Sequence, residues 1–213
     1  MDERATGIIL RVRPLTESSL ITHWLTPDQG RVATVAKGAR RPKSPFRGKL
    51  DLYFSANFSF RRSKRSELHN LREVSLLDTR SNLRRELARL KQGAYAVRLI
   101  ELATETETPI PGVHALFADF LHRLQNSPPS PVPILAFELG ILAEVGLQPD
   151  PAATRLTPKA QRIVEKLQAI DWHSPGGRAL TQDEFEDVAG FLKYFIANHL
   201  ERLPKGRDEA LLC

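Results

Sequence analysis

The sequence predicts an α+β protein of two domains, a small β-barrel over residues 1–79 followed by an all-α domain over residues 80–213. Two observations lead to this prediction. Apolar residues alternate with period two in short runs up to about residue 79, and beyond residue 80 they recur at intervals of three and four. With 213 residues, the chain is long enough to bury a core in each domain.

Turn residues separate the apolar runs of the first domain. In the first run Ile8, Leu10 and Val12 share a face, which we expect to point into the core. Pro27 and Gly30 indicate a hairpin turn after the second run. Five strands with a basic turn before the last one fit an oligonucleotide/oligosaccharide-binding (OB) barrel, and the spacing alone equally allows an SH3-like barrel. The five runs cover residues 6–14, 19–26, 30–38, 51–62 and 67–77.

Helical spacing dominates the second domain. The proline-rich stretch 128–133 predicts a stiff connector, and Thr157 followed by Pro158 predicts a helix start. Thr181 and Glu184 have the spacing of a capping box at the start of a further helix. About five helices are therefore expected.

Positive charge is concentrated in one part of the chain. Residues 31–65 contain eleven Lys and Arg against one acidic residue, Asp51, whereas the whole chain is only +6. A polyanion is the expected partner. As the partner, nucleic acid fits the pattern better than a membrane surface does. These cations are spread over short strands and a loop rich in Gly and Pro, whereas a membrane-binding segment would carry them along one side of an apolar helix.

Two basic clusters are the candidate nucleic-acid-binding sites. The first lies on the predicted loop 38–50, whose glycines and prolines exclude a helix or a central strand. The second lies at the turn before the fifth run. Contact with phosphates would give binding that is independent of sequence and sensitive to salt, and the alternative is a solvated charge run. The candidates are Lys37, Arg40, Arg41, Lys43, Arg47 and Lys49 in the first cluster, and Arg61, Arg62, Lys64 and Arg65 in the second.

Aromatic residues of the fourth run are expected mainly in the core. Phe54, Phe58 and Phe60 share a face with Leu52, and such a series usually fills a barrel. Tyr53, on the opposite face, is a candidate for stacking on a nucleobase.

The sequence gives little indication of a catalytic site or a cofactor site. The acidic residues are too scattered for a magnesium-dependent nuclease, and no Gly-Lys-Ser/Thr phosphate-binding loop is present. Glu101, Glu105 and Glu107 are interpreted as a solvated surface. The single cysteine, Cys213, can complete neither an internal disulfide nor a multi-cysteine zinc site. We therefore expect no enzyme activity, no metal and no cofactor. A cytoplasmic protein is expected, because no run is apolar for about 20 residues.

Several sequence blocks resemble the DNA repair protein RecO family. The most specific is the stretch 35–44 (Val-Ala-Lys-Gly-Ala-Arg-Arg-Pro-Lys-Ser), followed by Arg47-Gly48. Upstream, 7–11, 14–20 and 30–32 are also similar. A weaker similarity continues through 137–139, 142–149, 156–158 and 199–207.

The resemblance implies an N-terminal OB-fold and a helical second domain. It further implies a non-enzymatic recombination mediator that binds single- and double-stranded DNA and anneals complementary strands. With RecR, such a protein helps to load RecA onto DNA covered by single-strand-binding protein, whose tail is a further expected partner. It would work in the bacterial cytoplasm at the nucleoid. Many relatives carry a zinc insertion between the counterparts of Gly146 and Leu156, but only residues 147–155 fill that gap here, so zinc is not expected.

Two other functions remain open from the sequence. OB barrels also bind RNA, so an RNA-binding module is one alternative. A scaffold whose basic patch binds acidic protein tails is the other.

Overall fold

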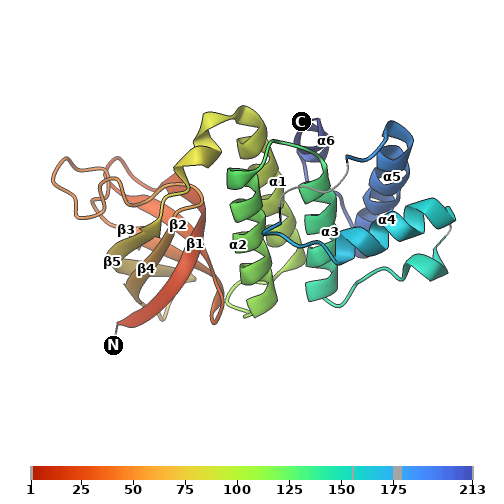
Figure 1. Ribbon diagram of the computed structural model, residues 1–213. Coiled ribbons are helices and arrows are strands. Elements are labelled where there is room, and N and C mark those ends of the chain that lie inside the picture. The colour runs from red at the N-terminus through yellow and green to blue at the C-terminus, as the bar shows by residue number, and fades with distance from the viewer. Residues whose placement is uncertain (1, 155, 175–178, 213) are drawn as a thin grey trace. The chain divides into compact units, whose positions relative to one another are not determined.

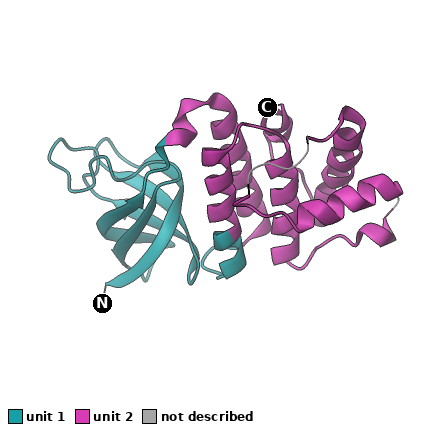
Figure 2. Ribbon diagram, viewed as in Figure 1, with its two compact units in different colours: residues 1–81, 105–115 teal, residues 82–104, 116–213 magenta. Residues whose placement is uncertain are grey.

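The first part of the protein is β-sheet and the remainder is helical (Figure 1), as the periodicity predicts. This arrangement confirms the α+β class. The computed structural model describes residues 2–154, 156–174 and 179–212. By their internal contacts the residues form two compact units (Figure 2), with residues 1–81 and 105–115 in unit 1 and residues 82–104 and 116–213 in unit 2.

Unit 1 contains a closed barrel with the strand order β1-β2-β3-β5-β4. The first strand pairs antiparallel with both β2 and β4, and β3 pairs parallel with β5. This five-stranded topology is that of the OB-fold, which decides between the two barrels that the spacing allowed. The strands are β1 (Glu3–Pro14), β2 (Leu20–Thr26), β3 (Gly30–Ala36), β4 (Ser55–Arg61) and β5 (Leu68–Asp78).

Aromatic rings fill the barrel. Trp24 stacks on Phe58 with ring centroids 4.1 Å apart, and Phe60 continues the stack at 5.7 Å. The indole nitrogen of Trp24 donates to Thr34 Oγ1 at 2.9 Å, so its one polar atom is satisfied inside the core. Phe54 belongs to the same cluster. The expectation that these phenylalanines are core residues is confirmed.

The predicted inward face of β1 needs a correction. The register shifts between Ile9 and Arg11, where a β-bulge interrupts the pairing with β2. A bulge changes which side chains point inward. The barrel core therefore includes Ile9 before the bulge and Val12 after it, whereas Ile8 and Leu10 are buried outside that cluster.

Unit 2 is built from helices whose starts follow the predicted signals. The Thr157 hydroxyl accepts from the Ala160 N–H, and the capping box of Thr181 and Glu184 is formed in both directions. The helices are η1 (Ser81–Arg85), α1 (Leu87–Ala103), α2 (Pro111–Asn126), α3 (Val132–Glu144), η2 (Pro151–Ala153), α4 (Pro158–Gln168), α5 (Gln182–His199) and α6 (Arg207–Leu211). No helix in the described ranges has both the length and the apolar character needed to cross a membrane.

A buried charged cluster fixes α6 against the other helices of unit 2. The Arg207 guanidinium donates to both oxygens of Glu138 at 2.6 and 2.8 Å, and the Tyr95 hydroxyl donates to the same carboxylate. Burial and the Glu138 charge raise the pKa of Tyr95 well above its usual value. Burial alone would lower the pKa of Arg207, but the hydrogen bond and charge of Glu138 raise it. The Arg207 guanidinium therefore stays charged, and the Tyr95 hydroxyl is neutral.

The segment 105–115 packs on the barrel although it follows α1 in the chain. Thr106 forms an isolated bridge with Arg31, and the Glu107 N–H donates to the Arg31 carbonyl at 3.0 Å. Gly30 lies directly beneath this segment: a Cβ there would stand 2.2 Å from the Thr108 carbonyl oxygen. The close approach therefore requires glycine, which also tolerates the φ of +66° at this turn.

Candidate nucleic-acid interface

Residues 37–50, the basic loop, form a chain of tight turns. Backbone N–H groups of Arg41, Ser44 and Arg47 each donate to the carbonyl three residues earlier, at 3.0, 3.1 and 3.2 Å. Gly38 and Gly48 take φ values of +68° and +71°, which side-chain-bearing residues rarely adopt. The backbone of the loop is therefore ordered by these turns, which fix the positions from which its side chains project.

Two apolar side chains anchor the basic loop in the barrel. Ala39 and Phe46 are 8% and 7% exposed and belong to the barrel core. The Arg40 N–H also donates to the Ser18 carbonyl at 3.0 Å, which ties the loop to the turn between β1 and β2. The anchors alternate with cationic residues, so burial of one set holds the other at the surface.

The cations of the basic loop are available to a polyanion. Five of the six are exposed, and Lys49 is half-buried with its Nζ donating to the Val74 carbonyl at 3.1 Å. Within the described residues none of the six forms an ion pair. The positive potential is therefore not neutralised internally. The exposed five are Lys37, Arg40, Arg41, Lys43 and Arg47.

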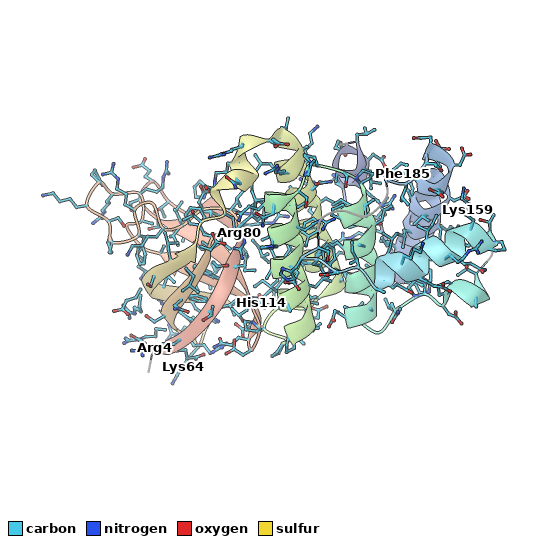
Figure 3. The ribbon with its side chains drawn as sticks, viewed as in Figure 1. Arg4, Lys64, Arg80, His114, Lys159 and Phe185 are labelled. Atoms are coloured by element: carbon cyan, nitrogen blue, oxygen red, sulfur yellow. The ribbon has the colours of Figure 1, made fainter. Side chains whose placement is uncertain are left out.

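The four cations of the second basic cluster are all exposed, but within the described residues only two of them form ion pairs. Arg61 Nε lies 3.0 Å from Asp2 Oδ1, and Arg62 makes a bidentate pair with Glu3 at 2.9 and 3.1 Å. Lys64 and Arg65 are exposed, and Figure 3 shows Lys64 at an edge of unit 1. The four candidates of this cluster are thus not equivalent.

Arg62 belongs to a network that the sequence pattern did not indicate. Its Nη1 lies 2.7 Å from Glu107 Oε2, whose other oxygen is 2.5 Å from His69 Nε2. The Ser63 N–H donates to His69 Nδ1 at 3.2 Å, so Nε2 carries the proton that is donated to Glu107. Glu107 is exposed, as the sequence predicts, but its carboxylate also pairs with Arg62 and His69 and so joins the segment 105–115 to the barrel.

The hydrogen bond between Arg62 and Glu3 shifts the pKa values of both groups. The hydrogen bond from Arg62 lowers the pKa of Glu3, against a smaller opposing effect of burial. The same hydrogen bond raises the pKa of Arg62. The guanidinium also lies 5.7 Å from the centre of the Phe60 ring, which adds a cation–π contact. Arg62 is thus held by protein groups.

Tyr53 is not placed to stack on a nucleobase. Its side chain is 3% exposed, and its backbone takes a φ of +66° in the turn before β4. The Tyr53 carbonyl accepts from Arg80 Nη1 at 2.6 Å, and burial lowers the pKa of that guanidinium. The same turn also directs Leu52 away from the core, and its side chain is 36% exposed. Both positions differ from the prediction because β4 begins at Ser55 and not near residue 51.

The remaining sequence expectations concern metals. Within the described residues no group of three or more His, Cys, Asp and Glu side chains is placed to hold a metal ion. The short segment 147–154, where a zinc insertion would stand, contains only η2. Cys213 and Arg155 lie outside the described residues.

Comparisons with known proteins give the same family for both parts of the chain. The family model "Recombination protein O N terminal" matches residues 1–80, and "Recombination protein O C terminal" matches residues 84–151. A DNA repair protein RecO of Anaeromyxobacter sp. (strain K) is 32% identical over 146 residues, which are 68% of this chain and 58% of that protein.

Two further relatives carry the same name. The DNA repair protein RecO of Symbiobacterium thermophilum is 30% identical over 148 residues, covering 69% of this chain and 58% of the relative. That of Myxococcus xanthus is 26% identical, with 90% of each chain covered. The chain therefore spans less than three fifths of the length of the first two relatives, and nearly all of the third.

Proposed function

Because the chain belongs to the RecO family, we propose that it is a DNA-binding recombination mediator in DNA repair. In this proposal it binds single- and double-stranded DNA, promotes annealing of complementary strands, and helps to load RecA onto DNA covered by single-strand-binding protein. It breaks no covalent bond and needs no cofactor. Residues 1–79 would be the nucleic-acid-binding domain and residues 80–213 the helical domain, acting at the bacterial nucleoid in the cytoplasm.

The observation that supports DNA binding best is the unneutralised charge of the basic loop. Each cation that contacts a phosphate releases a condensed counterion, and this gain does not depend on the base sequence. The turn-ordered backbone reduces the entropy lost when the side chains engage DNA. From the second cluster we propose Lys64 and Arg65 as additional phosphate contacts, because Arg61 and Arg62 are already paired with carboxylates.

Electrostatics alone can account for annealing. Two complementary strands repel each other through their phosphates, and cations bound to one strand reduce its repulsion of the other. A concentrated cationic surface therefore raises the rate at which bases meet without any catalytic group. The contacts are to the backbone, so the bases stay available for pairing.

A charge-reversal experiment tests this mechanism. Arg40→Glu with Arg41→Glu should weaken binding to oligonucleotides of unrelated sequence by similar factors and slow strand annealing. The control is Lys193→Glu with Arg202→Glu, which makes the same change in net charge at exposed positions of unit 2. Equal losses in both variants would mean that overall charge, and not the basic loop, drives binding. Preference for RNA over matched DNA would favour an RNA-binding module instead.

We propose that unit 2 supplies the protein-docking surface for a RecR-type partner and for the tail of single-strand-binding protein. A groove of about 780 Å³ in unit 2 combines cations of α4 with an apolar floor. Arg162 and Lys166 are exposed on its edge, beside Ile163 and Leu167 (Figure 3 marks α4 by Lys159). The lining contains four cations against two carboxylates, Asp171 and Glu184. A peptide with both carboxylates and apolar side chains is complementary to this positive and apolar lining, so we propose this groove for the tail.

Docking and DNA binding should be separable by mutation. Arg162→Glu with Lys166→Glu is expected to weaken binding of single-strand-binding protein and leave the affinity for free DNA unchanged. Titration of each ligand, followed by fluorescence anisotropy, measures both quantities on one preparation. Loss of DNA affinity with unchanged protein binding would contradict the assignment of the groove.

A further inference from the structure

The basic loop presents a cationic surface and also borders a small open pocket. The cavity measures about 400 Å³ and is lined by Arg40, Arg41 and Arg47 together with Leu20, Phe46 and Leu50. Phe46 is part of the barrel core, and Leu20 and Leu50 are partly buried against it. The pocket thus has an apolar floor that is fixed to the barrel and a rim of guanidinium groups.

Two of these arginines are held by single hydrogen bonds to the backbone. Arg47 Nη1 donates to the Pro42 carbonyl at 3.2 Å, and Arg40 Nη1 reaches the Thr16 carbonyl at 3.5 Å. A guanidinium has five N–H donors, so both retain most of their donors for a ligand. The planar groups are thereby oriented before any ligand arrives.

The third arginine packs against a glycine. A Cβ at Gly38 would stand 3.5 Å from Arg41 Cδ and 3.7 Å from Arg41 Nε, so part of this exposed side chain lies alongside the loop backbone. Arg40, Arg41 and Arg47 all line the same pocket.

We propose that this pocket receives one unstacked nucleobase of single-stranded DNA, an inference that rests on the proposed DNA-binding function. Phosphate contact alone requires only cations on an open surface. An apolar floor bordered by guanidinium planes is the chemistry that binds a splayed-out base, by burial of its face and by stacking on arginine. The neighbouring donors bind the flanking phosphates.

A preference for single-stranded over double-stranded DNA follows from whether the bases are already paired and stacked. In a single strand a base turns into the pocket at little cost, whereas in a duplex it must first be unpaired and unstacked. The basic loop would therefore bind both forms through phosphates and would gain the pocket contact only with single strands. Because one base is inserted regardless of identity, no strong sequence preference arises.

The test compares three ligands of equal length on the full chain: oligo(dT), an abasic single strand with the same backbone, and a duplex. Oligo(dT) should bind at least about fivefold more tightly than the abasic strand, the smallest gain expected from stacking one base. Equal affinity of oligo(dT) and the abasic strand would overturn the pocket and leave the proposed DNA binding standing. Failure to bind any of the three would overturn both.

A pocket-filling variant locates the effect. Leu50→Trp should abolish the difference between oligo(dT) and the abasic strand while affinity for the abasic strand and the duplex is unchanged, which also shows that the variant is folded. Leu52→Trp is the matched control, because Leu52 is exposed on the adjoining turn and does not line the cavity. A difference that persists in the Leu50 variant would place base contact elsewhere.

Discussion

Removal of the Glu138 carboxylate should be the most damaging single change in unit 2. Glu138 is fully buried, and its partner Arg207 has only 3% of its surface exposed. Replacing Glu138 by Leu leaves a buried guanidinium without its counter-charge and the Tyr95 hydroxyl without its acceptor. Loss of one partner of a buried ion pair typically costs about 3–5 kcal/mol.

That free energy translates into a clear thermal shift. In a chain of this size each kcal/mol lowers the melting temperature by about 2–4 °C, so a decrease of roughly 6–20 °C is expected. Circular dichroism at the helical minimum follows the transition. Lys193→Ala, at an exposed site on α5, serves as the control and should change the melting temperature little.

A compensating variant makes the reasoning refutable. Glu138→Leu combined with Arg207→Met and Tyr95→Phe replaces the whole cluster by apolar side chains of similar size. Because the desolvation cost of the charges then disappears, most of the lost stability should return. If the triple variant were less stable than Glu138→Leu alone, the damage would come from packing and not from an uncompensated charge.

Three further perturbations test other parts of the fold. Glu3 has a lowered pKa in the folded state through its bond to Arg62, so the stability it contributes at neutral pH is lost as the pH falls through that pKa. In denaturant titrations Glu3→Gln should therefore be less stable than the parent at pH 7, and the gap should close in acid. Gly30→Ala should destabilise the barrel and expose the segment 105–115 to proteolysis, because its Cβ would collide with the Thr108 carbonyl; a cleavage rate equal to that of the parent would contradict this contact. Thr181→Ala should cost about 1 kcal/mol in thermal unfolding through loss of the α5 cap, and no loss would mean that the capping box is not stabilising.

Local patterns predicted the elements of this fold well. Alternating apolar residues and turn signals located all five strands, and Thr157 and Thr181 located two helix starts. The same-face phenylalanines of β4 predict core residues, because such an aromatic series usually fills a barrel. These features depend on neighbours in sequence, so a single sequence contains enough information for them.

Other features depend on contacts that periodicity cannot reveal. The bulge after Ile9 changes which side chains of β1 point into the barrel. The turn with a positive φ at Tyr53 places the start of β4 at Ser55 instead of near residue 51. Glu107 lies 45 residues from Arg62 and 38 from His69, so no spacing rule connects them.

The basic loop was predictable as an exposed cationic segment because glycine and proline exclude regular structure there. Five of its six cations are exposed in the structure. The pocket was not predictable, since it needs Leu20 from β2 beside Phe46 and Leu50 from the loop.

The salt dependence of binding to single-stranded DNA tests the central claim most directly. If about five cations of the basic loop contact phosphates, the logarithm of the affinity should fall with the logarithm of salt concentration at a slope of about −3 to −4. Arg40→Glu with Arg41→Glu removes two contacts and should bring the slope to about −2, while Lys193→Glu with Arg202→Glu should leave it unchanged. An identical slope in the parent and the loop variant would contradict the claim that this loop binds the DNA backbone.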